Sequence, residues 1–147
     1  MVFGMLAAIS AKKPANRALS REGMTRMAPK FDTFAEFFPY YLAEHADPIC
    51  RGLHYFGTTL ASAVLIFAIY QKNWWLLALV PVCGYFFAWL GHFVFEKNRP
   101  ATFDYWRWSL IGDYKMYGLW ITGRIGPALE EALEKHGRRN SKGVQQV

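Results

Sequence analysis

The sequence predicts an all-α membrane protein: a hairpin of two membrane-spanning helices, flanked by amphipathic interfacial helices. Residues 52–70 and 73–95 form stretches of 19 and 23 residues without formal charge, if histidine counts as neutral. A helix of 19 residues is about 28 Å long, close to the hydrocarbon thickness of a bilayer. The composition agrees, because 53% apolar and 18% aromatic residues exclude a disordered chain.

A polar turn at residues 71–73 joins the two stretches, so we expect them to run antiparallel. The alternative is a pair of buried helices in a soluble bundle. We favour the interpretation as membrane-spanning helices, because a soluble domain of 147 residues rarely needs two helices that are apolar on every side. The expected organisation is a mobile basic tail at 1–30, a membrane domain over 31–125 with spans near 52–70 and 74–95, and a polar helix and tail at 126–147.

The net charge of +6 is distributed unevenly around these stretches. Seven Lys and Arg residues precede the first span, one lies between the spans and nine follow the second. The positive-inside rule then places both termini in the cytosol and Lys72 on the other side of the membrane. This would be the inner membrane of a bacterium or the endoplasmic reticulum of a eukaryote. Nucleic acid is not an expected partner, because no known binding motif accompanies the basic residues.

The flanking segments have interfacial character. Residues 31–45 predict an amphipathic helix, or a pair of turns broken by Pro39, on the membrane surface. Residues 103–123 resume helical spacing with an aromatic stripe. A third membrane-spanning helix is not expected there, because burying the carboxylates of Asp104 and Asp113 in the membrane costs free energy. We expect a helix that lies in the interface or inserts partly. Met24 is a plausible start, which would make residues 1–23 dispensable.

Three of the four histidines should meet at one end of the hairpin. His54 begins the first span and His92 ends the second, so antiparallel helices bring them to the same face of the membrane. Glu96 lies one helical turn after His92 and shares its side of the helix. A turn at Pro48 can fold His45 back over them.

Neutral imidazoles with a carboxylate are ligand types of non-haem Fe(II), which keeps open positions for substrate and oxygen. Zinc accepts the same atoms. The simpler alternative is that the histidines form only hydrogen bonds at the interface and that Glu96 belongs to a solvated cluster with Lys97 and Arg99. Asp113 would partner a histidine, or pair on the helix surface with Lys115 or a tyrosine.

The motifs resemble one known family. His45 and His54 are nine residues apart and are followed by Gly-Thr-Thr at 57–59, and "GHFVFEKNRPATF" occupies residues 91–103. This combination is similar to the 2-hydroxy fatty acid dioxygenase family, formerly a domain of unknown function, whose fungal member works in the endoplasmic reticulum. The resemblance covers roughly residues 31–125, and short chains such as this one look like its bacterial branch.

The resemblance implies Fe(II)-dependent α-oxidation, in which a 2-hydroxy fatty acid is shortened by one carbon with O2 and releases CO2. The implied metal ligands and catalytic residues are His45, His54 and His92, with Glu96 as fourth ligand or outer partner. Arg99 is the candidate partner of the substrate carboxylate, because a guanidinium binds carboxylates bidentately. Its alternative role is that of a positive anchor at the cytosolic face. We count Asp113 with Arg99 as a candidate substrate-binding residue.

The expected partners are a fatty-acyl substrate, membrane lipid and molecular oxygen, and a homo-oligomer is compatible with the sequence. The main rival is a non-catalytic membrane hairpin, an adaptor or a lipid-organising protein, whose histidines only cap helices. A di-iron membrane hydroxylase is less favoured, because its multiple histidine boxes are missing from the sequence.

Overall fold

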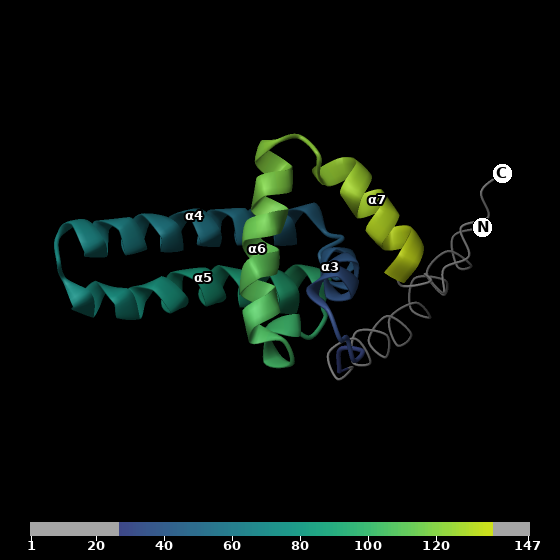
Figure 1. Ribbon diagram of the computed structural model, residues 1–147, viewed down its shortest axis with the longest axis horizontal. Coiled ribbons are helices and arrows are strands. Elements are labelled where there is room, and N and C mark those ends of the chain that lie inside the picture. The colour runs from purple at the N-terminus through teal and green to yellow at the C-terminus, as the bar shows by residue number, and fades with distance from the viewer. Residues whose placement is uncertain (1–26, 137–147) are drawn as a thin grey trace, which may run out of the picture.

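Helices are the only regular secondary structure in residues 27–136, the part of the chain that the computed structural model describes. The remaining residues, which include most of the predicted basic tail, lie outside the described part. In chain order the helices are α3 (Phe34–Ala43), α4 (Pro48–Tyr70), the short 3-10 helix η1 (Trp74–Ala78), α5 (Leu79–Leu90), the π-helical turn η2 (Gly91–Glu96), the 3-10 turn η3 (Ala101–Phe103), α6 (Trp106–Ile121) and α7 (Ile125–His136) (Figure 1).

The predicted hairpin consists of α4 and the antiparallel rod η1–α5–η2. Each arm has 23 residues and is long and apolar enough to cross a membrane, at about 34 Å for an ideal α-helix. The first arm begins at Pro48, earlier than the predicted start at residue 52. Asp47 explains this extension, because its carboxylate accepts from the backbone N–H groups of Ile49 at 2.7 Å and Cys50 at 3.1 Å. Proline at the first helical position then fits the missing donor there.

The apolar surface of the hairpin is mostly exposed. Of the most apolar stretch of each arm, only 22% is buried in α4 and 17% in the second arm. Large side chains such as Ile66, Phe67, Trp75 and Phe86 are among those exposed. A core helix of a soluble bundle would be buried on most sides, so the soluble alternative is disfavoured.

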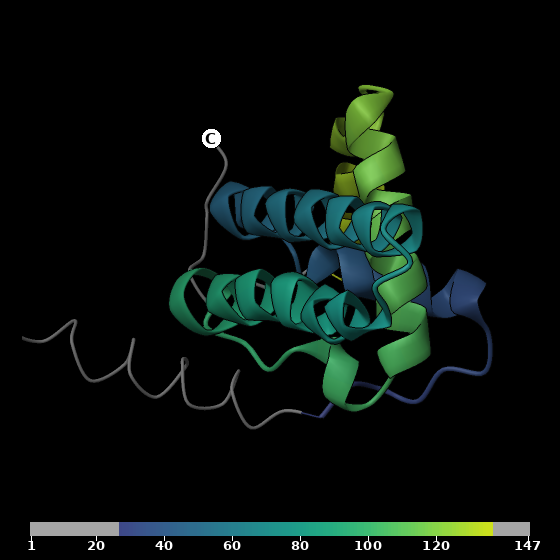
Figure 2. The ribbon, with the colours of Figure 1, turned by 90° about the vertical axis from the view of Figure 1, so that its left-hand side faces the viewer.

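α6 crosses the hairpin and lies against one side of it (Figures 1 and 2). Two hydrogen bonds of 2.9 Å tie it to α4, one between Thr59 and Tyr117 and one between Ser62 and Tyr114. At the open end of the hairpin, α3 packs against α6 and α7. The aromatic core lies there and contains Phe37, Phe38, Tyr41, Leu42 and Met116.

Of the two alternatives for the first amphipathic segment, the helix is confirmed and the pair of turns broken by Pro39 is wrong, because α3 runs without interruption through Pro39. Proline removes the hydrogen bond that its own N–H would donate to the preceding turn. Tertiary packing offsets this loss, since Phe37, Phe38, Tyr41 and Leu42 on the same short helix are all buried. The helix is therefore held by its neighbours more than by its own backbone.

Glycines allow the helices around the histidines to approach closely. A Cβ atom at Gly91 would lie 2.9 Å from the Cys50 sulfur, where η2 meets α4. A Cβ atom at Gly112 would lie 3.0–3.2 Å from three ring atoms of Tyr41, where α6 meets α3. These contacts bring the helices that carry the polar residues within hydrogen-bonding reach of one another.

We predict that Gly112→Ala lowers the free energy of unfolding by about 1–3 kcal/mol, because the added methyl group overpacks the contact with a fully buried ring. Gly118→Ala is the matched control on the same helix, since a Cβ atom there meets nothing within 4 Å. The control should raise stability by about 0.4–1 kcal/mol through the unfolded chain. Thermal unfolding in detergent compares the two, and equal shifts of both variants would contradict the proposed contact.

Candidate metal centre

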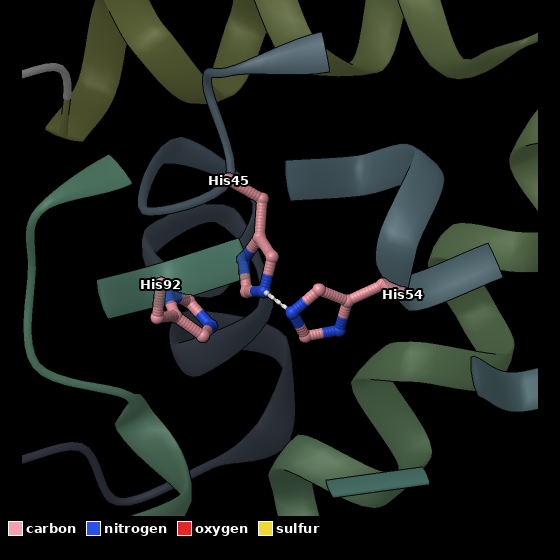
Figure 3. Close-up of side chains that lie close together, drawn as sticks. All are labelled: His45, His54 and His92. Carbon is pink, nitrogen blue, oxygen red and sulfur yellow. Dashed lines mark hydrogen bonds between the residues drawn. The ribbon is translucent and has the colours of Figure 1, made fainter. Parts of the chain in front are cut away.

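Three histidines from separate elements meet at the open end of the hairpin (Figure 3). His45 lies in the connector between α3 and α4, His54 in the second turn of α4, and His92 in the π-helical turn η2. Their ring centroids are 4.4 Å (His45–His54), 4.6 Å (His45–His92) and 5.1 Å (His54–His92) apart. One ligand-type atom from each lies within 4.8 Å of the others, so the group could hold a metal ion.

The three imidazoles are buried, with exposed fractions of 0%, 4% and 2% for His45, His54 and His92. The structure thus brings together the three histidines that the hairpin topology predicted to meet. Surface histidines that only cap helix ends would remain in contact with water. Burial costs free energy for each polar ring nitrogen unless that nitrogen has a partner.

The Nδ1 atom of each histidine forms a hydrogen bond with an oxygen atom. The partners are the backbone carbonyl of Tyr41 for His45 at 2.6 Å, a carboxylate oxygen of Asp113 for His54 at 2.6 Å, and the side-chain oxygen of Asn98 for His92 at 2.7 Å. A carbonyl or ionised carboxylate oxygen only accepts, so Nδ1 is the protonated nitrogen in His45 and His54. Nδ1 is also the protonated nitrogen in His92. The Asn98 NH2 group donates to the backbone carbonyl of Glu44 at 2.9 Å and to the Glu44 carboxylate at 2.8 Å, so the Asn98 atom that faces His92 is the oxygen, which accepts.

Because these hydrogen bonds use the Nδ1 atoms, the Nε2 atoms, each with a lone pair, are the ones that can bind a metal. The Nε2 atoms of His45 and His54 lie 3.2 Å apart (Figure 3). With both Nδ1 atoms protonated, two neutral rings would face each other with lone pairs, and a cation between them removes the repulsion. Imidazole ligands bound through one nitrogen and oriented by a carbonyl or carboxylate on the other are the usual arrangement at metal sites. The chemistry of the donor set therefore fits a metal ion.

The protonation state of His45 also suits metal binding. Burial lowers the pKa of His45 well below its ordinary value, and the nearby His54 and His92 lower it further. The ring is therefore neutral near pH 7, and the neutral ring is the form that binds metals.

Asp113 is a partner of a histidine, one of the two roles that the sequence left open. The same Asp113 oxygen accepts from His54 and, at 2.5 Å, from the hydroxyl of Tyr41, which is a buried residue of α3 and not a partner on the surface of α6. Burial, and then the Asp113 charge, raises the pKa of Tyr41, which keeps it a protonated donor. Asp113 thereby fixes the orientation of His54 and joins it to α3.

Glu96 and Arg99 have other neighbours. The Glu96 carboxylate accepts from the backbone N–H of Asp47 at the start of α4, and Glu96 is not a member of the group of converging ligand atoms. Arg99 forms an ion pair with Asp104 and lies over the Phe103 ring, 5.3 Å from its centroid. Metal binding by Glu96 and carboxylate binding by Arg99 stay predictions.

Sequence reasoning missed three residues that orient the histidines: Asn98, Glu44 and Tyr41. Asn98 is fully buried, although it lies in the charged run "EKNRP" that appeared solvated. A buried amide in such a run cannot be recognised without the tertiary contacts. Tyr41 lies one helical turn before His45, a spacing that could have indicated its carbonyl as a partner.

The fold and the site together define an all-helical protein with a three-histidine group able to hold a metal ion. A family model described as "2-hydroxy-palmitic acid dioxygenase Mpo1-like" matches residues 31–125, more than half of the chain. The chain belongs to this Mpo1-like family, and the resemblance inferred from its motifs is confirmed. The family's description indicates a dioxygenase of 2-hydroxy fatty acids. Comparison with curated proteins and with solved structures gave no match.

We predict that Asp113→Ala weakens metal binding about 10- to 100-fold, because outer partners of ligating histidines have effects of this size. Asp104→Ala is the control, since Asp104 pairs with Arg99 and contacts no histidine of the group in the described contacts. Competition with a chromophoric chelator under anaerobic conditions measures both affinities. If the two folded variants bind metal equally, the role assigned to Asp113 is wrong.

Proposed function

We propose that this chain is a membrane-embedded, Fe(II)-dependent dioxygenase that shortens 2-hydroxy fatty acids by one carbon. One observation supports this most strongly: three buried histidines bring one ring nitrogen each within 4.8 Å of the others, while an oxygen atom lies 2.6–2.7 Å from every Nδ1 atom. The family description supplies the dioxygenase class and the 2-hydroxy acid.

The choice of iron over other metals rests on the proposed reaction. Imidazole ligands suit iron, zinc, copper and nickel alike, so the donor set alone does not select one. Zinc has no redox chemistry, whereas a reaction with O2 needs a metal that changes oxidation state. When bound, ferrous iron supplies that redox chemistry.

The reaction balances without a further reductant. One 2-hydroxy acid and one O2 give the acid shorter by one carbon, CO2 and water. The bond between the carboxyl carbon and the hydroxylated carbon breaks, and the latter becomes the new carboxyl group. The electrons that the substrate loses reduce both atoms of O2, so no other cofactor is required.

The residues of the chain bind and orient in this scheme. His45, His54 and His92 would hold the metal through Nε2, because their Nδ1 atoms already have oxygen partners. Asp113, Asn98 and the Tyr41 carbonyl keep the imidazoles in one tautomer. The buried surroundings exclude water from the metal.

Arg99 is the proposed partner of the substrate carboxylate. Its guanidinium has five N–H donors, and the structure places one NH1 contact on Asp104. Glu96 acts as fourth ligand or as an outer partner that holds the start of α4 beside His45. Its hydrogen bond to the Asp47 N–H favours the second role.

Embedding in a membrane accounts for the exposed apolar surface of the hairpin. Trp74 and Trp75 lie at its turn next to Lys72, where an interfacial aromatic belt is expected. The metal centre lies at the other end of the arms, so a substrate can present its polar head there and leave its acyl chain along the hairpin. In this arrangement both termini are cytosolic, and an oligomer of the chain is compatible with it.

Single replacement of His45, His54 or His92 by alanine should remove most bound iron and the O2 consumption that 2-hydroxypalmitic acid supports. The hairpin should still insert, because insertion depends on the apolar arms. Metal analysis of the purified protein and an oxygen electrode measure the two effects. Iron at wild-type stoichiometry in all three variants would end the metal hypothesis and favour the non-catalytic adaptor or lipid-organising hairpin.

Arg99→Ala is the contrasting variant in the same assays. It should retain iron and weaken substrate binding by about 1.5–3 kcal/mol, the usual contribution of a hydrogen bond to a charged group. Glu96→Ala decides between the two roles of Glu96, since loss of iron indicates a ligand and retained iron an outer partner.

For topology, we expect that a cysteine replacing Lys72 reacts with a membrane-impermeant maleimide only from the side opposite the cytosol, because the Lys and Arg count is lopsided. The background variant has Cys50 and Cys83 replaced by alanine, since both are free thiols. Glu134→Cys on the exposed surface of α7 is the control for the cytosolic side. Labelling of position 72 from the cytosol alone would refute this topology.

A further inference from the structure

A cavity of about 170 Å³ lies between α4, α5 and α6, directly beside the histidine group. His54 and Asp113 line one of its ends, so the cavity and the metal centre share these two residues. Ala61 on α4 and Val80 and Pro81 on α5 line it farther along the hairpin. The cavity therefore extends from the site toward the hairpin turn.

The wall changes from polar to apolar along this direction. Ala61 lies seven residues after His54, or about 10 Å along the helix axis. Gly84 faces Ala61, because a Cβ atom built on it would be 3.8 Å from the alanine methyl group. Since the arms are antiparallel, Val80 lies about one helical turn closer to the hairpin turn than Gly84.

Small residues create the cavity, and α6 covers it. Ala61 and Gly84 leave space where larger side chains would fill the gap between the arms. Leu110 and Tyr114 of α6 close one side, and Tyr114 is fixed by its hydrogen bond to Ser62 at 2.9 Å. The two arms of the hairpin continue beyond α6 (Figure 1). Large apolar side chains toward the hairpin turn, such as Ile66 and Phe67, are exposed.

The volume suits part of an acyl chain. A cavity of about 150 Å³ can hold benzene, so this one holds roughly six carbon atoms. A cavity lined by His54 and Asp113 beside the metal centre, and by apolar residues farther along the hairpin, matches an amphiphile with one polar end. A single unbranched acyl chain fits this cavity, because its lining residues extend about 10 Å along α4 and come from three helices.

We propose that this cavity binds the first carbons of the substrate's acyl chain, next to the head group, and that Ala61 and Gly84 are its specificity-determining residues. The proposal rests on the proposed function for the placement of the head group at the histidines. The rest of a long chain lies outside the cavity, among the exposed apolar side chains of the hairpin and the surrounding lipid. The protein therefore selects against branching and bulk near the head group, and only weakly for total chain length.

Photo-crosslinking of the full-length protein in lipid nanodiscs tests the position of the chain. One analogue of 2-hydroxypalmitic acid carries a diazirine about six carbons from the hydroxyl group, the depth that the cavity holds, and a second carries it at the chain end. The first should label the peptides with Ala61, Gly84 or Leu110, and excess 2-hydroxypalmitic acid should compete. The second should label mainly lipid. Labelling by the first probe only at outward-facing residues such as Val82 would overturn the proposal.

A matched pair of variants tests the size of the cavity. Ala61→Phe fills it, whereas Ala63→Phe adds the same volume at an exposed position two residues along α4. Excluding two methylene groups costs more than tenfold in affinity, since each buried methylene contributes about fourfold. We expect labelling of the Ala61→Phe variant to be at least tenfold weaker than labelling of the Ala63→Phe variant, with equal metal content in the two. Equal labelling in the two variants would refute the assignment.

Failure of this proposal can be distinguished from failure of the proposed function. Crosslinking in the cavity without iron or O2 consumption would support the acyl site and contradict the dioxygenase. Turnover of 2-hydroxy acids with crosslinks elsewhere would support the dioxygenase and overturn the acyl site. Gly84→Ala adds a methyl group in ordinary contact with Ala61 and folds without a clash. In that variant, discrimination against an analogue methylated about six carbons from the hydroxylated carbon, the depth at which Gly84 faces Ala61, should increase. Unchanged discrimination would contradict the proposal.

Discussion

A single carboxylate oxygen of Asp113 connects the parts of this protein that its site depends on. It accepts from His54 on α4 at 2.6 Å and from Tyr41 on α3 at 2.5 Å, while Asp113 itself belongs to α6. Two consecutive helices, α3 and α4, are thereby joined at one atom to α6, which is distant from them in sequence. The close approach at Gly112 makes this geometry possible, because a side chain there would push α6 away from the Tyr41 ring.

The histidine group is one layer of a larger polar network. The Glu44 carbonyl accepts a hydrogen bond from the Asn98 NH2 group, and the Asn98 oxygen accepts one from His92. The Tyr41 carbonyl accepts one from His45. Buried networks of this kind specify a structure only when every member has a partner. Here each Nδ1 atom has an oxygen partner, so the Nε2 atoms are the ones that can bind a metal. The π-helical turn that carries His92 fits this pattern, since such turns often occur at functional sites.

The protein combines this buried polar centre with an apolar hairpin whose surface is mostly exposed. In water the two would conflict, because an exposed apolar surface of this size favours aggregation or association. In the proposed membrane setting they serve one purpose. An amphiphilic substrate has the same division, with a polar head and a long apolar chain, so a site at the end of a hairpin can contact both parts at once.

The sequence by itself determined the two apolar arms, their antiparallel return and the meeting of His45, His54 and His92, because uncharged length and a short polar turn are local properties. It also determined the family, through motifs that lie next to these histidines. Only the tertiary structure decided that the Nδ1 atom of His54 meets Asp113, that Asn98 is buried within a charged run, and that α3 continues through Pro39. The reason is the same in each case: these features depend on contacts between residues far apart in the chain, and burial there outweighs the local preference of the residue. The placement of Glu96 on the Asp47 N–H also follows from such a contact, since helix spacing alone puts Glu96 on the side of His92 without saying which atom its carboxylate meets.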